Sequence, residues 1–261
     1  MKEKILLFIP GYNCEKQIIR VLENIDCSAL KYLDEIIFVN NRSKDKTEEM
    51  VLNYIKKNPN IKLKVLRNSM NYNLGGSHKV AFNYAIENNF DYIIVLHGDD
   101  QGNIHDILPY LKNKDYTKYD CLLGSRFLKD SKLIGYSKFR ILGNKIFNII
   151  YSLCIGQKVK DLGSGLNMYN VKILKNKFYN GFPDELTFNY FMLMAADYYK
   201  HSIKYFPITW REEDQISNVK IIKQSIDTFM FVLKYKFNKE CIKDDFRNNK
   251  IVNYESKEIK C

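Results

Sequence analysis

The sequence predicts an α/β fold: one domain built on a mainly parallel central sheet with helices on both faces. Over the first 125 residues, short apolar runs alternate with longer segments whose apolar residues recur at helical spacing. Continuous apolar runs are typical of strands that are buried on both faces of a parallel sheet. Eight of the twelve glycines lie directly after such runs or in GSG at 163–165. Parallel sheets bind their ligands beyond these strand ends.

The first half of the chain predicts five strands joined by helices. The strands are expected at residues 5–9, 35–39, 62–66, 92–97 and 119–124. Helical spacing of apolar residues predicts the intervening helices at 15–25, 44–58, 77–88 and 105–113. Strand–helix–strand units of this length form right-handed crossovers, which make the strands parallel.

The second half predicts longer helices and fewer strands. Helices are expected at 137–155, 184–200 and 217–237, and short strands at 165–169 and 203–207. The final residues, 248–261, are polar and are expected to lack stable structure. The longest apolar stretch, at 146–156, is too short to span a membrane.

Charge and cysteine usage narrow the class of partner and the compartment. The net charge of +11 is compatible with an anionic partner, but an ordinary lysine-rich surface is the favoured explanation. Lysines form no block with arginines and aromatic residues, so we expect no nucleic-acid partner. Six cysteines without paired spacing, and an N-terminus unlike a signal peptide, predict a cytoplasmic protein. Contact with the inner face of the cell membrane is the alternative.

Two adjacent carboxylates, Asp99 and Asp100, follow the predicted strand at 92–97. Because like charges repel, this juxtaposition requires compensation. A hard divalent cation such as Mg²⁺ or Mn²⁺ would supply it, since these ions bind carboxylates together with substrate phosphates. The alternative is a turn that leads into the helix at 105–113, where aspartate is also common. The strand-end position and the flanking glycines favour the metal.

Other features have two interpretations each. His97 is a ligand or a structural histidine. Asp184 and Glu185 are general-base candidates, or acids that begin a helix. The helix at 225–237 packs on the core or lies against anionic lipid.

The chain lacks the phosphate-binding motifs that are typical of several enzyme classes. The glycine-rich run at 71–79 opens a helix, and its backbone N–H groups suit a phosphate. It matches neither the P-loop nor the dinucleotide fingerprint, and PGYN at 10–13 follows the first strand instead. These features argue against an NAD-type enzyme, and the lack of a GxSxG elbow argues against an α/β-hydrolase.

Taken in order, these segments resemble the family 2 glycosyltransferases of the GT-A fold, including the branch that acts on polyprenyl phosphates. The resemblance rests on FIPGYNCEKQI at 8–18, IFVNNRSKDKT at 37–47, NYNLGGSHKVAFNYAI at 71–86, VLHGDDQGN at 95–103, LGSRF at 123–127, RILGN at 140–144 and DLGSGLNMY at 161–169. It implies one glycosyltransferase domain over residues 1–240, with a nucleotide-binding half (1–127), an acceptor half (128–240) and a polar tail (241–261).

The resemblance also implies roles for individual residues. Asp99 would hold Mg²⁺ or Mn²⁺, with Asp100 as a second carboxylate. The nucleotide-sugar donor would be bound by Pro10, Tyr12, Asn13, Glu15, Asn40, Asn41, Ser43, Gly75, Gly76, Ser77, Lys79, His97 and Asp99. Phosphate oxygens of donor or acceptor would be bound by Arg126, Arg140 and Arg211. Asp184 and Glu185 stay the general-base candidates.

Three positions depart from the family pattern. Asn40 and Asn41 stand where the family has an aspartate pair, His97 replaces the first acid of the metal motif, and 210–220 lacks a glycine and a lysine of the lipid-phosphate branch. The expected activity is inverting transfer of a sugar from a nucleotide-sugar donor to a lipid-linked or surface-glycan acceptor. An acceptor hydroxyl would need a general base, whereas an acceptor phosphate would not. The alternatives are a catalytically silent nucleotide-sugar or lipid-binding protein and a nucleotidyltransferase.

Overall fold

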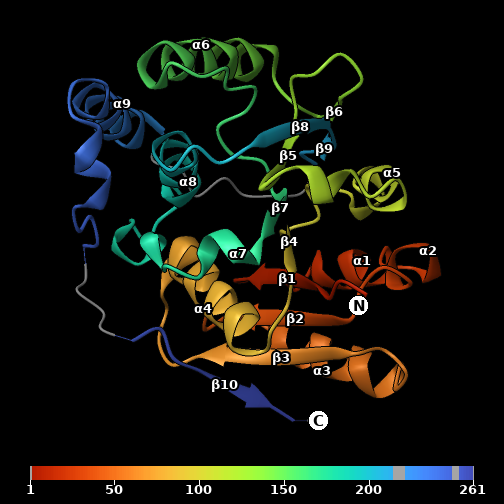
Figure 1. Cartoon of the computed structure of the whole chain (residues 1–261). Coiled ribbons are helices and arrows are strands. Elements are labelled where there is room, and N and C mark those ends of the chain that lie inside the picture. The colour runs from red at the N-terminus through yellow and green to blue at the C-terminus, as the bar shows by residue number, and fades with distance from the viewer. Residues whose placement is uncertain (1, 214–220, 249–252, 261) are drawn as a thin grey trace.

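A computed structural model describes residues 2–213, 221–248 and 253–260, apart from the side chains of 221–228. Its centre is an eight-stranded sheet in the order β10-β3-β2-β1-β4-β7-β5-β8 (Figure 1). The strands are β1 (Ile5–Gly11), β2 (Glu35–Asn40), β3 (Leu63–Asn68), β4 (Tyr92–Leu96), β5 (Cys121–Ser125), β7 (Leu166–Asn170), β8 (Ile203–Pro207) and β10 (Ser256–Ile259). A separate pair contains β6 (Lys132–Ile134) and β9 (Thr209–Arg211).

The sheet is mixed, with a parallel centre. β1 pairs in parallel with β2 and β4, β2 pairs in parallel with β3, and β5 pairs in parallel with β8. β7 is antiparallel to both β4 and β5, between which it is inserted. The predicted strands are confirmed to within a few residues, and the inversion at β7 is a feature that the sequence pattern did not predict.

Helices cover both faces of the sheet. They are α1 (Ile18–Glu23), α2 (Cys27–Leu30), α3 (Thr47–Lys57), α4 (Asn73–Glu87), α5 (Leu108–Lys112), α6 (Lys138–Ile155), α7 (Val171–Leu174), α8 (Phe188–Tyr198) and α9 (Ile221–Phe237). Four short 3₁₀ turns complete the described part: η1 (Ile104–Asp106), η2 (Asp115–Lys118), η3 (Phe178–Gly181) and η4 (Lys239–Lys243).

Side chains of β1 point alternately to the two faces of the sheet and contribute to two separate hydrophobic cores. Leu6 and Phe8 pack into a cluster with side chains of α4, α6, α7, α8 and α9. Ile5, Leu7 and Ile9 pack on the other face with side chains of α1, α2, α3 and α5. Period-two alternation in a strand directs successive side chains to opposite faces, so the sheet separates two helical layers.

The polar tail contains a strand, β10, which corrects the expectation for residues 253–260; residues 249–252 and 261 lie outside the described residues. β10 pairs antiparallel with β3 and occupies the edge of the sheet. Ser69 N–H also donates to the carbonyl of Glu255. Strand pairing satisfies backbone groups whatever the polarity of the side chains, so a polar segment closes this edge.

The helix expected at 217–237 is α9, and its first residues, 217–220, lie outside the described residues. Val232 and Tyr235 of α9 are fully buried. The Tyr235 hydroxyl donates to Asp197 Oδ2 at 2.7 Å, and that carboxylate also pairs with Lys239. The interpretation of this helix as a core-packing element is confirmed for these residues.

Candidate active site

The acidic loop begins where β4 ends in the middle of the sheet. All five residues of β4 are buried. Gly98 follows, and its N–H donates to the Pro10 carbonyl at 3.1 Å. A Cβ on Gly98 would lie 2.9 Å from that oxygen, so glycine permits the close approach of the loops after β1 and β4. The chain then bends at Asp100, which adopts a left-handed conformation with φ 59°.

Two arginines compensate the charge of Asp100. Its carboxylate is 8% exposed; Oδ2 accepts from Nε of Arg20 at 2.7 Å and lies 3.6 Å from Nη1 of Arg211. Arg20 comes from α1 and Arg211 from β9, so the three charges meet only in the folded chain. Protein cations thus engage Asp100 through Oδ2. Its role as a second metal-binding carboxylate stays a prediction.

Asp99 has a different environment. Its side chain is partly exposed, and Oδ1 accepts from the Gln101 N–H at 3.2 Å. Burial raises the pKa of Asp99 to about 6, with the Asp100 charge adding to the shift. Burial of the Asp99 side chain disfavours its charged form. A nearby cation would compensate for this and stabilise the ionised carboxylate.

A divalent cation fits this loop only if substrate phosphates complete its coordination. Among the residues that the structure describes, no group of three His, Cys, Asp or Glu side chains is arranged to hold a metal. Mg²⁺ and Mn²⁺ commonly use one or two carboxylates and complete their coordination with water and substrate phosphates. Asp99, with its raised pKa, suits that role.

The acidic loop borders a cavity of about 330 Å³. Its walls come from α1, from the segment after β4 and from β9, and are formed by Arg20, Glu23, Asn24, Asp100, Gln101, Gly102, Asn103, Thr209 and Arg211. The β9 wall is fixed to the loop, because Arg211 N–H donates to the Gln101 carbonyl at 3.0 Å. Two guanidinium groups at one cavity are suited to phosphate oxygens.

Arg20 is the site residue that the sequence analysis missed. It lies 80 positions before Asp100, in a helix whose pattern indicated only an apolar stripe. The scarcity of arginine in a lysine-rich chain was the available signal, since only seven arginines are present. That signal cannot distinguish Arg20 from the others without the fold.

His97 is packed as a structural histidine. Its backbone N–H donates to the Gly165 carbonyl at 2.9 Å, and a Cβ on Gly165 would come within 2.9 Å of its ring. Burial lowers the pKa of His97 to about 4. The ring is therefore neutral at pH 7 and does not replace the charge of the acid that the resemblance places here.

The loops after β1 and β2 are joined by polar contacts. Asn13 is left-handed at φ 51°, and its N–H donates to Ser43 Oγ at 3.1 Å. Asn13 Oδ1 and Glu15 Oε2 accept backbone N–H groups from the segment after β2, each at 2.8 Å. Tyr12 between them is 42% exposed. Tyr12, Asn13, Glu15 and Ser43 are thus brought together on the edge where the parallel strands end, and their role in binding a nucleotide stays a prediction.

Asn40 and Asn41 are buried and brace these loops. Asn40 donates to Glu48 Oε2 at 2.6 Å. Asn41 Oδ1 accepts from the Asn68 side chain at 2.9 Å and from the Tyr72 N–H at 2.8 Å. An aspartate could not donate the bond that Asn40 makes, which gives that departure from the family pattern a structural reason.

The glycine-rich run has a structural role that the sequence analysis did not anticipate. Gly75 and Gly76 lie in the first turns of α4, and their N–H groups donate to the Asp184 carbonyl at 2.6 and 3.3 Å. A Cβ on Gly75 would lie 2.5 Å from the Pro183 carbonyl. Ser77 is buried too, and its hydroxyl donates to the Asn73 carbonyl. The helix-start donors that suited a phosphate are occupied by protein.

Lys79 and Asp184 form a buried ion pair, which corrects their assignments as donor-binding residue and general base. Lys79 Nζ lies 2.7 Å from Asp184 Oδ1, and the two side chains are 0% and 5% exposed. The Phe182 carbonyl and the Tyr254 hydroxyl also bind Lys79. Burial lowers the pKa of Lys79 to about 8. Glu185 points elsewhere and accepts from the Asn248 side chain at 2.6 Å.

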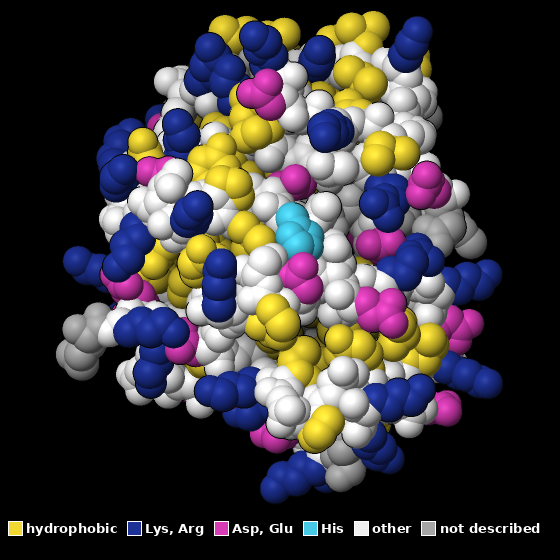
Figure 2. Space-filling model, turned by 90° about the vertical axis from the view of Figure 1, so that its right-hand side faces the viewer, with side chains coloured by type: hydrophobic (Ala, Val, Ile, Leu, Met, Phe, Trp, Pro, Cys, Tyr) yellow, Lys and Arg dark blue, Asp and Glu magenta, His cyan; other side chains and the backbone are white. Residues whose placement is uncertain are grey.

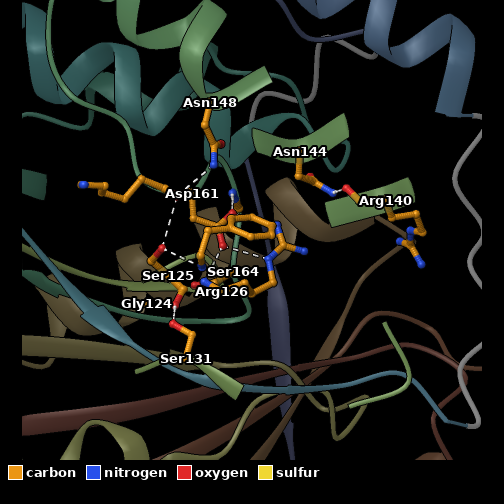
Figure 3. Close-up of polar contacts among 12 residues, drawn as sticks. Gly124, Ser125, Arg126, Ser131, Arg140, Asn144, Asn148, Asp161 and Ser164 are labelled. Atoms are coloured by element: carbon orange, nitrogen blue, oxygen red, sulfur yellow. Dashed lines mark hydrogen bonds and ion pairs between the residues drawn. The ribbon is translucent and has the colours of Figure 1, made fainter. Parts of the chain in front are cut away.

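Arg126 is bound to protein rather than presented to a phosphate. Nε and Nη2 bind the two carboxylate oxygens of Asp161 at 2.8 and 2.7 Å (Figure 3). Nη1 donates to the Tyr136 hydroxyl, and the guanidinium lies 5.1 Å from the Trp210 ring centroid. The side chain is only 9% exposed. This geometry corrects the assignment of Arg126 as a phosphate ligand.

Arg140 and Arg211 have different partners. Arg140, from α6, pairs with Glu212 and lies over the Tyr136 ring. Figure 3 shows Arg140 apart from the Arg126–Asp161 pair, on the side of Asn144. Of the three arginines predicted to bind phosphate, Arg211 is the one that lines the cavity.

The order of strands and the acidic loop beyond β4 are those of the GT-A class of folds. The chain belongs to glycosyl transferase family 2, whose family model matches residues 7–178. It is 26% identical over 263 residues to a dolichyl-phosphate beta-glucosyltransferase of Trichomonas vaginalis, covering 92% of this chain and 76% of the relative. It is 28% identical over 175 residues to an undecaprenyl-phosphate 4-deoxy-4-formamido-L-arabinose transferase of Photorhabdus laumondii, covering 66% and 51%.

Solved structures show the same fold at low identity. Glucosyl-3-phosphoglycerate synthase from Mycobacterium tuberculosis in complex with UDP gives a TM-score of 0.60 at 11% identity, over 89% of this chain and 80% of the other. S. aureus TarS 1–349 with UDP-GlcNAc gives 0.57 at 19%, over 89% and 66%. The mannosyltransferase PcManGT from Pyrobaculum calidifontis, solved with GDP-Man and Mn²⁺, gives 0.57 at 13%, over 94% and 65%.

Proposed function

We propose that the protein transfers a sugar, with inversion, from a nucleotide-sugar donor to a lipid-linked phosphate acceptor, using Mg²⁺ or Mn²⁺. The observation that carries the proposal is the strand-end loop after β4. In this loop Asp99, with a pKa raised to about 6, directly precedes Asp100 and Gln101, which border a cavity together with Arg20 and Arg211. A negatively charged leaving group needs positive charge where it develops.

The residues of the loop would divide the work. Asp99, together with donor phosphates, would hold the cation, whose charge would stabilise the departing diphosphate. Arg20 and Arg211 would contact phosphate oxygens, while Asp100 keeps both guanidinium groups at the cavity through its contacts of 2.7 and 3.6 Å. Tyr12, Asn13 and Ser43 would line the nucleoside pocket at the ends of β1 and β2.

The state of the base candidates favours a phosphate acceptor. Asp184 is paired with Lys79 and receives the Tyr254 hydroxyl at 2.7 Å. Glu185 accepts from Asn248. An acceptor phosphate is already ionised and needs no general base, whereas a hydroxyl would. The dolichyl- and undecaprenyl-phosphate relatives support the same acceptor class. We further propose a cytoplasmic location at the inner face of the membrane.

A donor panel tests the proposal. The purified chain is incubated with UDP-, GDP- or dTDP-sugars, Mn²⁺ and a polyprenyl phosphate, and lipid-linked sugar is measured. Asp99→Asn should lower turnover at least a hundredfold while the melting temperature stays near that of the wild type. A variant that keeps its turnover would contradict the metal-holding role of Asp99. A wild type that binds donor but never transfers sugar would support the silent-binding alternative.

A further inference from the structure

Helix α6 carries a row of exposed apolar side chains, here named the α6 ridge. Its members are Phe139, Leu142, Ile146, Ile149 and Leu153, and they are between 48% and 84% exposed. They recur at intervals of three and four residues, which places them on one face of the helix. Between Phe139 and Leu153 the helix rises roughly 20 Å, at about 1.5 Å per residue.

The opposite face of α6 fixes the helix to the protein. Tyr151, Cys154 and Ile155 are buried in the core. Asn148 Nδ2 donates to the Lys160 carbonyl at 2.9 Å. The helix is therefore apolar on its packed face and on its outer face, a pattern expected for an element that is covered on both sides. A contiguous exposed apolar surface of this kind marks an interaction site.

The chain segment that contains the ridge carries basic residues only, and the acid that pairs with it, Glu212 on Arg140, comes from outside the segment. Residues 131–160 contain six lysines and arginines and no aspartate or glutamate. Lys138, Lys145 and Lys158 are exposed. Figure 2 shows basic side chains bordering hydrophobic ones along the upper edge of the molecule, the end at which α6 lies in Figure 1. The partner of this surface should therefore have an apolar interior and an anionic outer layer.

We propose that the α6 ridge lies in the surface of an anionic lipid bilayer, with the helix axis parallel to the membrane plane. The apolar side chains would enter the boundary with the acyl chains, and the lysines would reach outward to lipid phosphates. A second copy of the chain is a poorer partner, because a symmetric pair would bring the same basic side chains together. The lipid contact is thus placed on α6.

The position of α6 connects this surface to the catalytic loop. Arg140 of α6 pairs with Glu212. The preceding residue, Arg211, lies 3.6 Å from Asp100 Oδ2 and lines the cavity. A helix resting on the bilayer would hold the cavity near the level of the lipid headgroups, where a lipid-linked acceptor carries its phosphate. This one connection rests on the proposed function, whereas the docking itself does not.

Vesicle flotation tests the docking. The full chain is floated with vesicles of phosphatidylcholine containing phosphatidylglycerol, and with phosphatidylcholine alone. The double variant Ile149→Asp/Leu153→Asp should lower the bound fraction at least tenfold. Met70→Asp is the matched control, because Met70 is 50% exposed in the loop after β3, away from α6, and it should bind like the wild type. Binding should be strongest with phosphatidylglycerol at low salt.

Two results would overturn the docking: equal flotation of the double variant and the wild type, or a wild-type dimer in sedimentation that the same double variant dissociates without vesicles. The melting temperature of each variant verifies folding. Donor binding and sugar transfer test the proposed function separately from the docking. The ridge variant should keep the melting-temperature shift that a UDP- or GDP-sugar gives with Mn²⁺, whereas Asp99→Asn should float normally and lose transfer.

Discussion

Lys79 Nζ lies 2.7 Å from Asp184 Oδ1 in the interior, and the two side chains are 0% and 5% exposed. The pair joins α4 to the segment that precedes α8. Breaking a buried pair leaves an uncompensated charge, which costs much more than the pair itself contributes.

Lys79→Met should therefore destabilise the protein by about 3–5 kcal/mol in urea unfolding, since it leaves the Asp184 carboxylate buried without its ammonium partner. Lys79→Met/Asp184→Asn should cost less than the sum of the two single changes, because neither charge then remains. Lys118→Met, at an exposed lysine, should leave stability unchanged. Additive effects of the two single changes would contradict the pairing.

Arg126→Lys tests whether Arg126 serves the fold or a phosphate. A lysine cannot reproduce the two parallel bonds to Asp161, so stability should fall by about 2–4 kcal/mol in urea unfolding. Nucleotide-sugar affinity, measured by calorimetry at a temperature where the variant is folded, should stay within twofold. Normal stability together with lost donor affinity would restore the phosphate role.

His78 should make stability depend on pH in the acidic range. Burial lowers the pKa of His78 to about 3, from 6.5 for a free side chain. Between these values the unfolded chain binds the extra proton and the folded protein does not, so acidification favours unfolding. The contribution is about 2 kcal/mol lost between pH 6.5 and pH 5.

His78→Phe removes this titration in a pocket already lined by Phe8, Phe82 and Phe188. Unfolding free energies measured at pH 7.5 and pH 5 should therefore differ less in the variant than in the wild type. An identical pH dependence of the two proteins would show that His78 is protonated without penalty in the fold.

Two glycines predict opposite outcomes for the same substitution. Gly98→Ala would place a Cβ 2.9 Å from the Pro10 carbonyl, and should destabilise the protein by about 1–3 kcal/mol while displacing Asp99. Gly143→Ala lies within α6 with no atom within 4 Å of the added carbon. It should stabilise the protein by up to about 1 kcal/mol, because alanine is the better helix former. Thermal unfolding of both variants distinguishes the cases.

The sequence determined the layered architecture, because hydrophobic periodicity is a local property. Continuous apolar runs at β1, β2 and β4 specify buried strands, and helical stripes specify the elements that cover them. The position of Asp99 at a strand end follows from the same pattern, and so does the orientation of the parallel strands. The sequence also predicted membership of family 2, because the motifs of this family lie in short contiguous segments.

Only the tertiary structure decided which charges meet. Asp100 finds Arg20 from 80 positions away, and Lys79 finds Asp184 from 105 positions away. The polar β10 acquires its place by backbone pairing with β3, which side-chain pattern does not encode. Periodicity reports which face of an element is apolar, whereas ion pairing and edge pairing depend on distances that exist only after the chain has folded. For that reason, the contribution of Arg20 to the cavity became visible only in three dimensions.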